Sequence, residues 1–147
     1  SSAASDVYKR QLCGDGLKLS YRHSAYYDNG CTITGVYFKL KKGNPDEIKS
    51  KMQDLMGRRK SKQPLEFASA GSTFKRPEGY FAGALIEECN LKGTTIGGAQ
   101  VSTKHAGFVI NTGGATCNDV LALCKQVSDT VYKEKGVRLE MEVRVTK

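Results

Sequence analysis

The sequence predicts an α+β fold, with a mixed or antiparallel sheet and two to three packed helices. Two kinds of pattern support this prediction and follow one another along the chain: helical apolar periodicity that begins at capping residues, and shorter stretches in which apolar and polar residues alternate. The length of 147 residues suits one ordinary domain with, at most, part of a second. The expected order of elements is β-α-β-α-β-β-α-β.

The first two expected elements are a strand over residues 31–41 and a helix over residues 45–62. The strand is predicted because β-branched and aromatic residues alternate along it. Asn44 is the expected N-cap of the helix, and Pro45 suits its first position because proline there gives up no helical hydrogen bond. The helix is expected to end before Gln63. Its apolar face would consist of Ile48, Met52 and Leu55.

The middle of the chain predicts a strand or loop, then a short helix, then a buried strand. Residues 65–76 precede Pro77, which favours extended geometry in the residue before it. A helix is expected over residues 80–89 and a buried strand over residues 108–110, with short alternating pieces between them. The helix would place on one side Phe81, Leu85 and Ile86.

A long helix and a half-buried strand are expected at the C-terminal end. Thr116, with Asp119 three residues later, opens a helix that should reach about Lys135 and end at Gly136. Residues 137–145 alternate strictly between apolar and charged and therefore predict a strand. The apolar stripe of the helix would consist of Val120, Leu123, Cys124, Val127 and Val131.

The net charge of +8 is concentrated in one part of the chain. Residues 39–62 hold nine basic residues against three acidic ones, which suits either an anion-binding surface or, more commonly, a solvated helix face. The absence of tryptophan and of basic-aromatic alternation argues against a nucleic-acid platform. No apolar run is long enough to span a membrane.

Cysteine usage points to a cytoplasmic setting. The five cysteines include no Cys-x-x-Cys pair, which argues against a disulfide framework and a structural zinc site, so no metal is expected. Residues 1–11 have no periodicity and no apolar core of a secretory signal, and are expected to be a scar of cloning or sequence assembly.

Four residues are candidates for chemistry on their local context alone, and each also has an ordinary structural interpretation. Ser72 lies between a glycine and a Lys-Arg-Pro sequence, where a hydroxyl could exchange a proton with an anionic ligand, although turn-capping serines are more common. Glu142 is expected on the polar face of the last strand, where ion pairing is the usual role. Arg22 could bind a carboxylate or phosphate through its planar fork. His105 is more often a hydrogen-bonded histidine than a metal ligand.

Several motifs in the second half of the chain nevertheless occur in a family-specific order. Over about residues 65–144 they resemble the C-terminal domain of the UDP-N-acetylenolpyruvoylglucosamine reductase family, also called UDP-N-acetylmuramate dehydrogenase. A looser stretch from Tyr21 onward resembles the end of that family's flavin-binding domain. The motifs are Ala70-Gly-Ser-Thr-Phe-Lys-Arg-Pro77, Ala82-Gly-Ala-Leu-Ile-Glu87, Ile96-Gly-Gly-Ala-Gln-Val-Ser102, Lys104-His-Ala-Gly-Phe108 and Leu139-Glu-Met-Glu-Val-Arg144.

The resemblance implies a reaction and a set of site residues. In the family, NADPH reduces FAD, and the flavin delivers hydride to the enolpyruvyl ether of a UDP-sugar in peptidoglycan synthesis. By match, Ser72 would protonate the enolate, while Glu142 and Arg22 would polarise the substrate carboxylate. Arg76 replaces the usual asparagine of the family, and His23 stands where an acidic residue is common. The implied substrate contacts are Lys75, Arg76, Tyr21 and His105, and the implied cofactor contact is Gly71.

The resemblance also implies a division of the chain. Residues 12–64 would be the C-terminal remnant of the FAD-binding domain, and residues 65–147 the substrate-binding domain. The glycine-rich flavin loop has no counterpart in this sequence, so the chain alone is expected to be inactive. The complete enzyme is expected to be a bacterial, cytoplasmic monomer that binds a UDP-sugar but neither nucleic acid nor membrane. The alternative is a small basic nucleotide- or nucleic-acid-binding module that uses residues 39–62.

Overall fold

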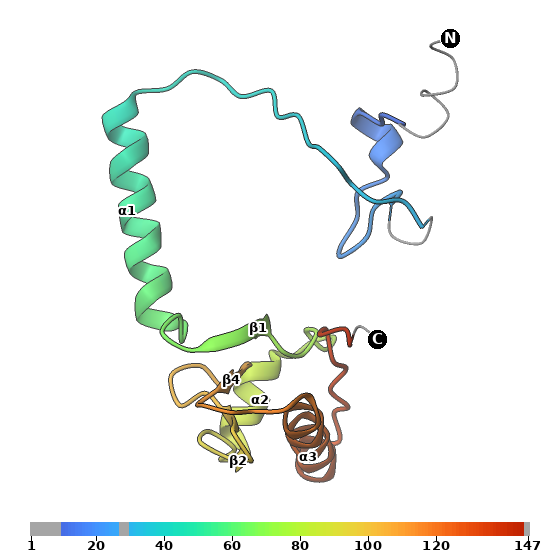
Figure 1. The fold of residues 1–147 in the computed structure, drawn as a ribbon, viewed down its shortest axis with the longest axis vertical. Helices are drawn as coiled ribbons and strands as arrows, with labels where there is room; N and C mark the ends of the chain where they lie inside the picture. The colour runs from blue at the N-terminus through green and yellow to red at the C-terminus, as the bar shows by residue number, and fades with distance from the viewer. Residues whose placement is uncertain (1–9, 27–29, 146–147) are drawn as a thin grey trace. The chain divides into compact units, whose positions relative to one another are not determined.

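The computed structural model describes residues 10–26 and 30–145 and divides into two units, Ser1–Lys42 and Gly43–Lys147 (Figure 1). Most of the predicted first segment, residues 1–11, therefore lies outside the described residues. The first unit contains one described 3₁₀ turn, η1 (Gly14–Leu17), which the sequence did not predict. The elements of the second unit are α1 (Pro45–Lys62), β1 (Ala68–Ser72), α2 (Ala82–Glu88), β2 (Thr95–Ile96), β3 (Ala99–Val101), β4 (Phe108–Asn111) and α3 (Cys117–Lys135).

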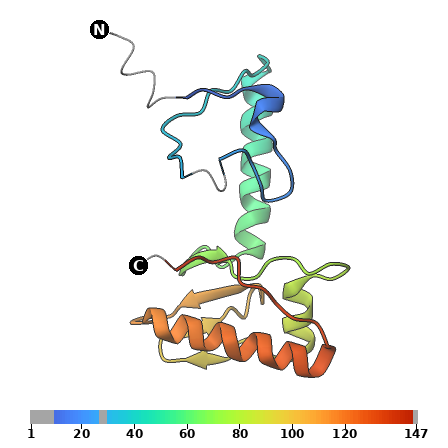
Figure 2. The same cartoon turned by 90° about the vertical axis from the view of Figure 1, so that its right-hand side faces the viewer.

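The second unit is built on a four-stranded sheet in the order β1-β4-β3-β2, and every neighbouring pair is antiparallel. The last strand in sequence, β4, lies between β1 and β3, which brings the residues around Ser72 beside those around Phe108. α3 packs on β2 and β3, and α2 packs on α3 (Figure 2). The predicted α+β class with an antiparallel sheet is confirmed.

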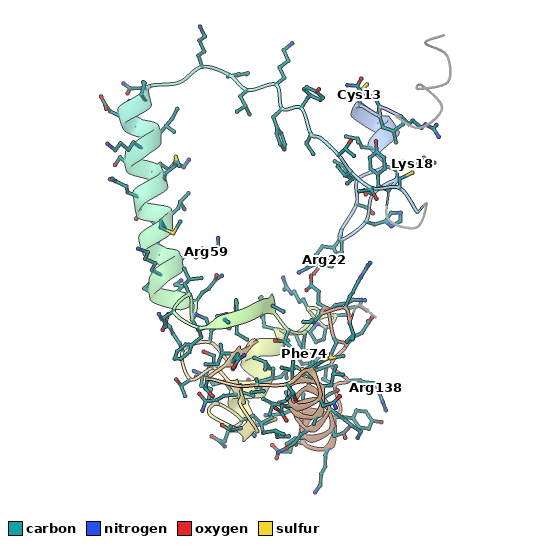
Figure 3. All side chains as sticks on the ribbon, viewed as in Figure 1. Cys13, Lys18, Arg22, Arg59, Phe74 and Arg138 are labelled. Carbon is teal, nitrogen blue, oxygen red and sulfur yellow. The ribbon has the colours of Figure 1, made fainter. Side chains whose placement is uncertain are left out.

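The core of the second unit lies between the sheet, α2 and α3. Phe74 is 4% exposed and sits among packed side chains (Figure 3). Leu85 and Ile86 are buried as predicted, but Phe81 is 63% exposed. Phe81 is the N-cap of α2 and has extended backbone angles, so its side chain does not continue the apolar face of the helix.

α1 confirms the predicted helix, including both of its ends. It begins at Pro45, and the side chain of Asn44 accepts hydrogen bonds from the backbone of Asp46 and Glu47. No residue of the helix is buried, and the predicted apolar face of Ile48, Met52 and Leu55 is about half exposed or more. The capping residues therefore specify where the helix begins and ends, but its apolar face stays exposed.

α3 also follows its local signals. Thr116 and Asp119 form a reciprocal capping box, and Gly136 ends the helix in the left-handed region at φ 70°. The predicted stripe is buried at four positions and partly buried at Val120. The turn between β2 and β3 approaches the segment before α3 closely, and this requires glycine at position 98. A Cβ there would lie 2.4 Å from the backbone of Gly113 and Ala115. The buried positions of the stripe are Leu123, Cys124, Val127 and Val131.

Two predicted strands are wrong. Residues 31–41 form no strand, and their large apolar side chains, such as Tyr37 and Phe38, are 91% and 79% exposed. Residues 137–145 form only a single antiparallel bridge, between Met141 and Phe74. Alternation records which face of a segment is apolar, but a strand also requires a neighbour along its length to complete its backbone hydrogen bonds.

Candidate active site

Ser72 lies at the end of β1, where the pairing with β4 is irregular. Ser69 is opposite Ile110, but Ser72 is opposite Phe108, so β1 carries an extra residue between these pairs. Gly71 occupies the left-handed region at φ 88°, which suits glycine because it has no Cβ. The bulge changes the direction of the chain at Ser72, whose side chain is exposed.

The residues after Ser72 bring the C-terminal segment alongside β1. The backbone N–H of Lys75 donates to the carbonyl of Glu140 at 2.8 Å, and that of Glu142 donates to the carbonyl of Thr73 at 2.9 Å. These two bonds flank the bridge between Phe74 and Met141. Glu142 is thereby held opposite Thr73, one residue from Ser72, although the two candidates are 70 positions apart in the sequence.

The charged side chains at this junction are partly shielded from solvent. Lys75 is half-buried, and its Nζ forms an ion pair with Glu140. Glu142 was predicted on an exposed polar face, but it is half-buried and its Oε2 is shielded from solvent, while Met141 is exposed. The strict alternation fails at this point because the segment pairs at one bridge instead of along a full ladder.

Arg76 is held by the loop that follows it. Its guanidinium carbon lies 4.0 Å from the centroid of the Phe81 ring, and its Nε donates to the carbonyl of Tyr80 at 3.3 Å. Stacking on an aromatic ring restrains the plane of a guanidinium and adds cation–π attraction. This arrangement also gives the exposed Phe81 a contact outside the core.

His105 lies on the loop between β3 and β4. Its Nδ1 accepts the backbone N–H of Gly107 at 3.0 Å, so the neutral ring carries its proton on Nε2. The ring meets Phe108 edge-to-face, with centroids 5.0 Å apart, and Phe108 is the β4 residue opposite Ser72. The half-buried His105 therefore contacts the β4 residue that lies opposite Ser72.

Tyr21 and Arg22 belong to the first unit, Ser1–Lys42. Arg22 has a left-handed backbone at φ 57°, within a turn closed by paired hydrogen bonds between Ser20 and His23. Its guanidinium carbon lies 5.6 Å from the centroid of the Tyr21 ring. The predicted participation of both residues in a site with Ser72 stays a prediction.

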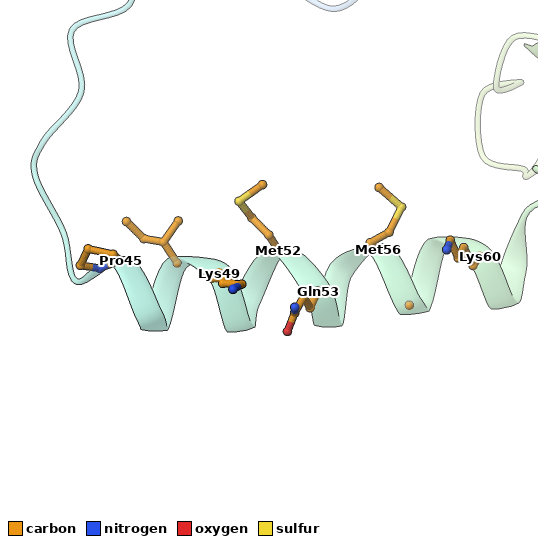
Figure 4. Close-up of a pocket in the computed structure, with 8 residues that line it drawn as sticks. Pro45, Lys49, Met52, Gln53, Met56 and Lys60 are labelled. Atoms are coloured by element: carbon orange, nitrogen blue, oxygen red, sulfur yellow. The ribbon is translucent and has the colours of Figure 1, made fainter.

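The basic helix α1 presents a different surface. A shallow apolar hollow runs along it, and Figure 4 shows Met52 and Met56 projecting from the same side of the helix. All of its lining residues come from α1, and none is a predicted site residue. A single helix face cannot surround a small ligand, so this hollow is not a candidate active site.

Other kinds of site receive no support from the described part of the chain. Across residues 10–26 and 30–145, no three His, Cys, Asp or Glu side chains cluster in a way that could hold a metal ion. In the same residues, no helix is both long and apolar enough to cross a bilayer. Cys13, Cys89, Cys117 and Cys124 are free thiols.

Thr73 is a residue of the site region that the sequence reasoning missed. It is 2% exposed, and its hydroxyl oxygen accepts the backbone N–H of Val109 at 3.0 Å. A threonine beside a serine, between a glycine and a buried phenylalanine, gives no signal by itself. Only the irregular pairing of β1 with β4 reveals its role.

Comparison with known proteins places these features in a family. Residues 63–146 match the model of the UDP-N-acetylenolpyruvoylglucosamine reductase C-terminal domain. The chain is 53% identical over 135 residues to the UDP-N-acetylenolpyruvoylglucosamine reductase of Clostridium novyi, covering 92% of this chain and 44% of that protein. It is 52% identical over 135 residues to the reductase of Clostridioides difficile, with the same coverage of each protein.

A solved structure agrees with the sequence relatives. The crystal structure of UDP-N-acetylenolpyruvylglucosamine reductase from Thermus caldophilus is 36% identical, with a TM-score of 0.74 over 90% of this chain and 47% of that one. The chain thus spans less than half the length of the relatives it matches. From the family model, the curated relatives and the solved fold together, the chain belongs to the UDP-N-acetylenolpyruvoylglucosamine reductase family.

Proposed function

We propose that this chain supplies the substrate-binding part of a bacterial reductase that converts UDP-N-acetylglucosamine enolpyruvate to UDP-N-acetylmuramate for peptidoglycan synthesis. The observation that carries the proposal is the junction of β1 with the C-terminal segment, which holds Glu142 opposite Thr73, the residue that follows Ser72. In this proposal residues 12–64 end the FAD-binding domain and residues 65–147 form the substrate-binding domain. The family match over residues 63–146 supports this division.

The proposal includes FAD as cofactor and NADPH as cosubstrate. The fit of a flavin can be tested at Gly71, where a Cβ would meet nothing within 4 Å. The backbone there leaves room for the close approach of a flat ring, which is compatible with the cofactor contact that the family resemblance implies for Gly71. When bound, the flavin supplies hydride transfer, with NADPH as its reductant.

The residues of this chain would carry the proton and the charge. Ser72 would donate its hydroxyl proton to the enolate carbon, a step that needs the anionic intermediate because serine is a weak acid at neutral pH. Glu142 and Arg22 would polarise the substrate carboxylate as negative charge develops beside it. The shielded Oε2 of Glu142 supports this role, since a polar group excluded from water acts more strongly on a neighbour.

The remaining contacts suit an anionic UDP-sugar. Lys75 is paired with Glu140, and a substrate anion would compete for its ammonium. Arg76, restrained by Phe81 and the carbonyl of Tyr80, would offer a planar fork to a phosphate or carboxylate. His105 and Tyr21 would complete the substrate contacts. We further propose that the complete enzyme is a cytoplasmic monomer with neither nucleic acid nor membrane as partner.

A grafted reductase tests the role of Ser72. The grafted reductase is the Clostridium novyi relative in which the 135 matching residues are replaced by the corresponding residues of this chain. The Ser72→Ala variant is expected to lower substrate-dependent NADPH oxidation by ~10²–10⁴-fold, because the proton donor is lost. Flavin reduction by NADPH without substrate should be unchanged. Ser50→Ala, on the exposed face of α1, is the matched control.

The outcomes of this experiment are distinct. Full turnover by Ser72→Ala would contradict the proposed proton donor, and an inactive grafted protein that binds flavin would contradict the assignment of this chain as the substrate domain. The 147-residue chain alone is expected to show no turnover. Flavin absorbance at about one flavin per isolated chain would overturn that expectation, since one bound flavin per protein is the stoichiometry of a complete site.

The alternative, a small basic nucleotide- or nucleic-acid-binding module, would use the basic residues of the segment 39–62, most of which lie on α1. In the structure two of these residues are already engaged: Arg58 pairs with Asp54 at 2.9 Å, and Arg59 donates to the side chain of Gln63 at 3.0 Å. Family membership favours the reductase. Salt-sensitive binding of duplex DNA to the chain would favour the alternative.

A further inference from the structure

Thr73 combines deep burial with three hydrogen bonds to two separate segments. Its backbone N–H donates to the carbonyl of Gly107 at 2.9 Å, and its carbonyl accepts from the backbone of Glu142 at 2.9 Å. Its Oγ1 accepts from the backbone of Val109 at 3.0 Å. Within the described residues, Thr73 and Ser102 are the buried polar side chains, both 2% exposed or less.

The hydroxyl of Thr73 compensates for the irregular pairing of β1. Val109 lies opposite Val101 in the β3–β4 ladder, but these two residues do not hydrogen-bond to each other. The backbone bonds between the two strands are formed by the residues on either side, so the N–H of Val109 faces β1. The bulge before Ser72 removes the regular backbone pairing at this point. Val109 is 7% exposed, and Thr73 Oγ1 supplies the acceptor that water cannot.

The same residue determines the relative placement of two candidate catalytic groups. Ser72 is joined to it by a peptide bond, and Glu142 is held by its carbonyl. Phe74, on its other side, is anchored in the core at 4% exposure. Movement of Thr73 away from β4 would therefore displace both Ser72 and Glu142 from β4 and the rest of the sheet.

We propose that Thr73 is a positioning residue of the reductase, whose hydroxyl, by satisfying Val109 across the β1 bulge, fixes Ser72 and Glu142 in their working geometry. This inference rests on the proposed function and names a residue that acts through its neighbours without contacting substrate. A misplacement of about 1 Å at a reacting group can lower a rate by ~10²-fold, so a modest shift of the bulge is sufficient for a measurable effect.

The first test is spectroscopic and uses the 147-residue chain. Thr73→Val keeps the shape of the side chain and removes the acceptor, whereas Thr73→Ser keeps the acceptor. The amide proton resonance of Val109 is expected to move upfield in Thr73→Val and to stay near its original position in Thr73→Ser. The amide of Val101, which donates to the carbonyl of Thr94 at 2.9 Å, is the internal reference.

The second test uses the grafted reductase. Thr73→Val is expected to lower kcat by ~10–100-fold, with KM for the UDP-sugar changed less than about threefold, because the defect lies in the geometry of the chemical step. Flavin reduction by NADPH without substrate should stay at its original rate, and Thr73→Ser should recover most of kcat. Val127→Ala, a core substitution in α3, controls for loss of stability alone and should retain kcat.

Each outcome has a defined meaning. A normal kcat in folded Thr73→Val, or an equal loss of kcat in Thr73→Ser and Thr73→Val, would overturn the inference. If Thr73→Val does not fold, Thr73→Cys replaces it, because a thiol is a weaker acceptor than the otherwise matched serine hydroxyl. A normal kcat in Ser72→Ala would instead remove the proposed proton donor, so the two proposals fail by different results.

Discussion

At the scale of single residues, position on a helix decides whether a thiol is reactive. Cys117 and Cys124 both lie on α3, but Cys117 is exposed, whereas Cys124 is 1% exposed. Burial raises the pKa of the Cys124 thiol to about 11, which leaves almost no thiolate at neutral pH. Brief treatment of the folded chain with iodoacetamide is therefore expected to modify Cys117 but not Cys124.

Peptide mass spectrometry measures this prediction directly. Modification in urea, where both thiols are exposed, provides the control that both cysteine-containing peptides are detectable. Cys89, also buried and with its pKa raised by desolvation, should follow Cys124. Equal modification of Cys117 and Cys124 in the folded chain would show that the inner face of α3 opens readily to solvent.

Single residues also show where sequence reasoning about the site stops. The motif around Ser72 and Lys75 was predictable because the family resemblance depends on local residue order. The opposition of Glu142 to Thr73 depends on a bridge between segments far apart in the sequence. The role of Thr73 was missed because it follows from a bulge, and the pairing irregularity is not encoded by any short pattern.

At the scale of elements, the capping box of α3 predicts a dependence of stability on pH. The backbone N–H of Thr116 donates to the Asp119 carboxylate at 2.8 Å and holds the pKa of Asp119 below its usual 3.8. Because the folded-state pKa is the lower one, this stabilisation is complete above about pH 3.8 and is lost as pH falls through the folded value. Asp119→Asn should therefore be less stable than the original chain at neutral pH.

The difference between the two chains should shrink as the pH falls below 3.8, because the original Asp119 then becomes protonated and also loses its charge. Urea unfolding at a series of pH values, followed by circular dichroism, gives the free energy of unfolding for both chains. Asp129→Asn removes the same charge from an exposed position on α3 and should change stability little. A difference that stays constant across this pH range would contradict the assigned role of the Asp119 carboxylate.

The elements also differ in how far the sequence predicted them. α1 and α3 were predicted to within a residue or so, because Asn44, Thr116 and Gly136 act within one turn of the helix end. The strand expected over residues 31–41 was wrong, although its alternation was regular. A helix satisfies its backbone hydrogen bonds internally, whereas a strand depends on a neighbour that its own sequence does not specify.

At the scale of the whole molecule, two long helices of similar length are stabilised by different means. α3 has 19 residues and buries four apolar side chains in the core, whereas α1 has 18 residues and buries none. Isolated helices of this length are only marginally stable in water, and most helical stability in proteins comes from packing. In the isolated chain, α1 therefore depends on its N-cap and on surface contacts such as the ion pair of Arg58 with Asp54.

We accordingly expect the amides of α1 to exchange with solvent far faster than those of α3. Core amides open only with the unfolding of the whole unit, whereas helices without packing open locally at little cost. Hydrogen exchange followed by mass spectrometry should show peptides from residues 48–60 deuterated within seconds, while peptides from residues 120–132 stay protected for at least ~10²-fold longer. Exchange of the urea-unfolded chain corrects for intrinsic rates. Equal protection of the two helices would mean that the apolar face of Ile48, Met52 and Leu55 is covered in solution, and dilution of the sample would then distinguish coverage by a second copy from coverage within the chain.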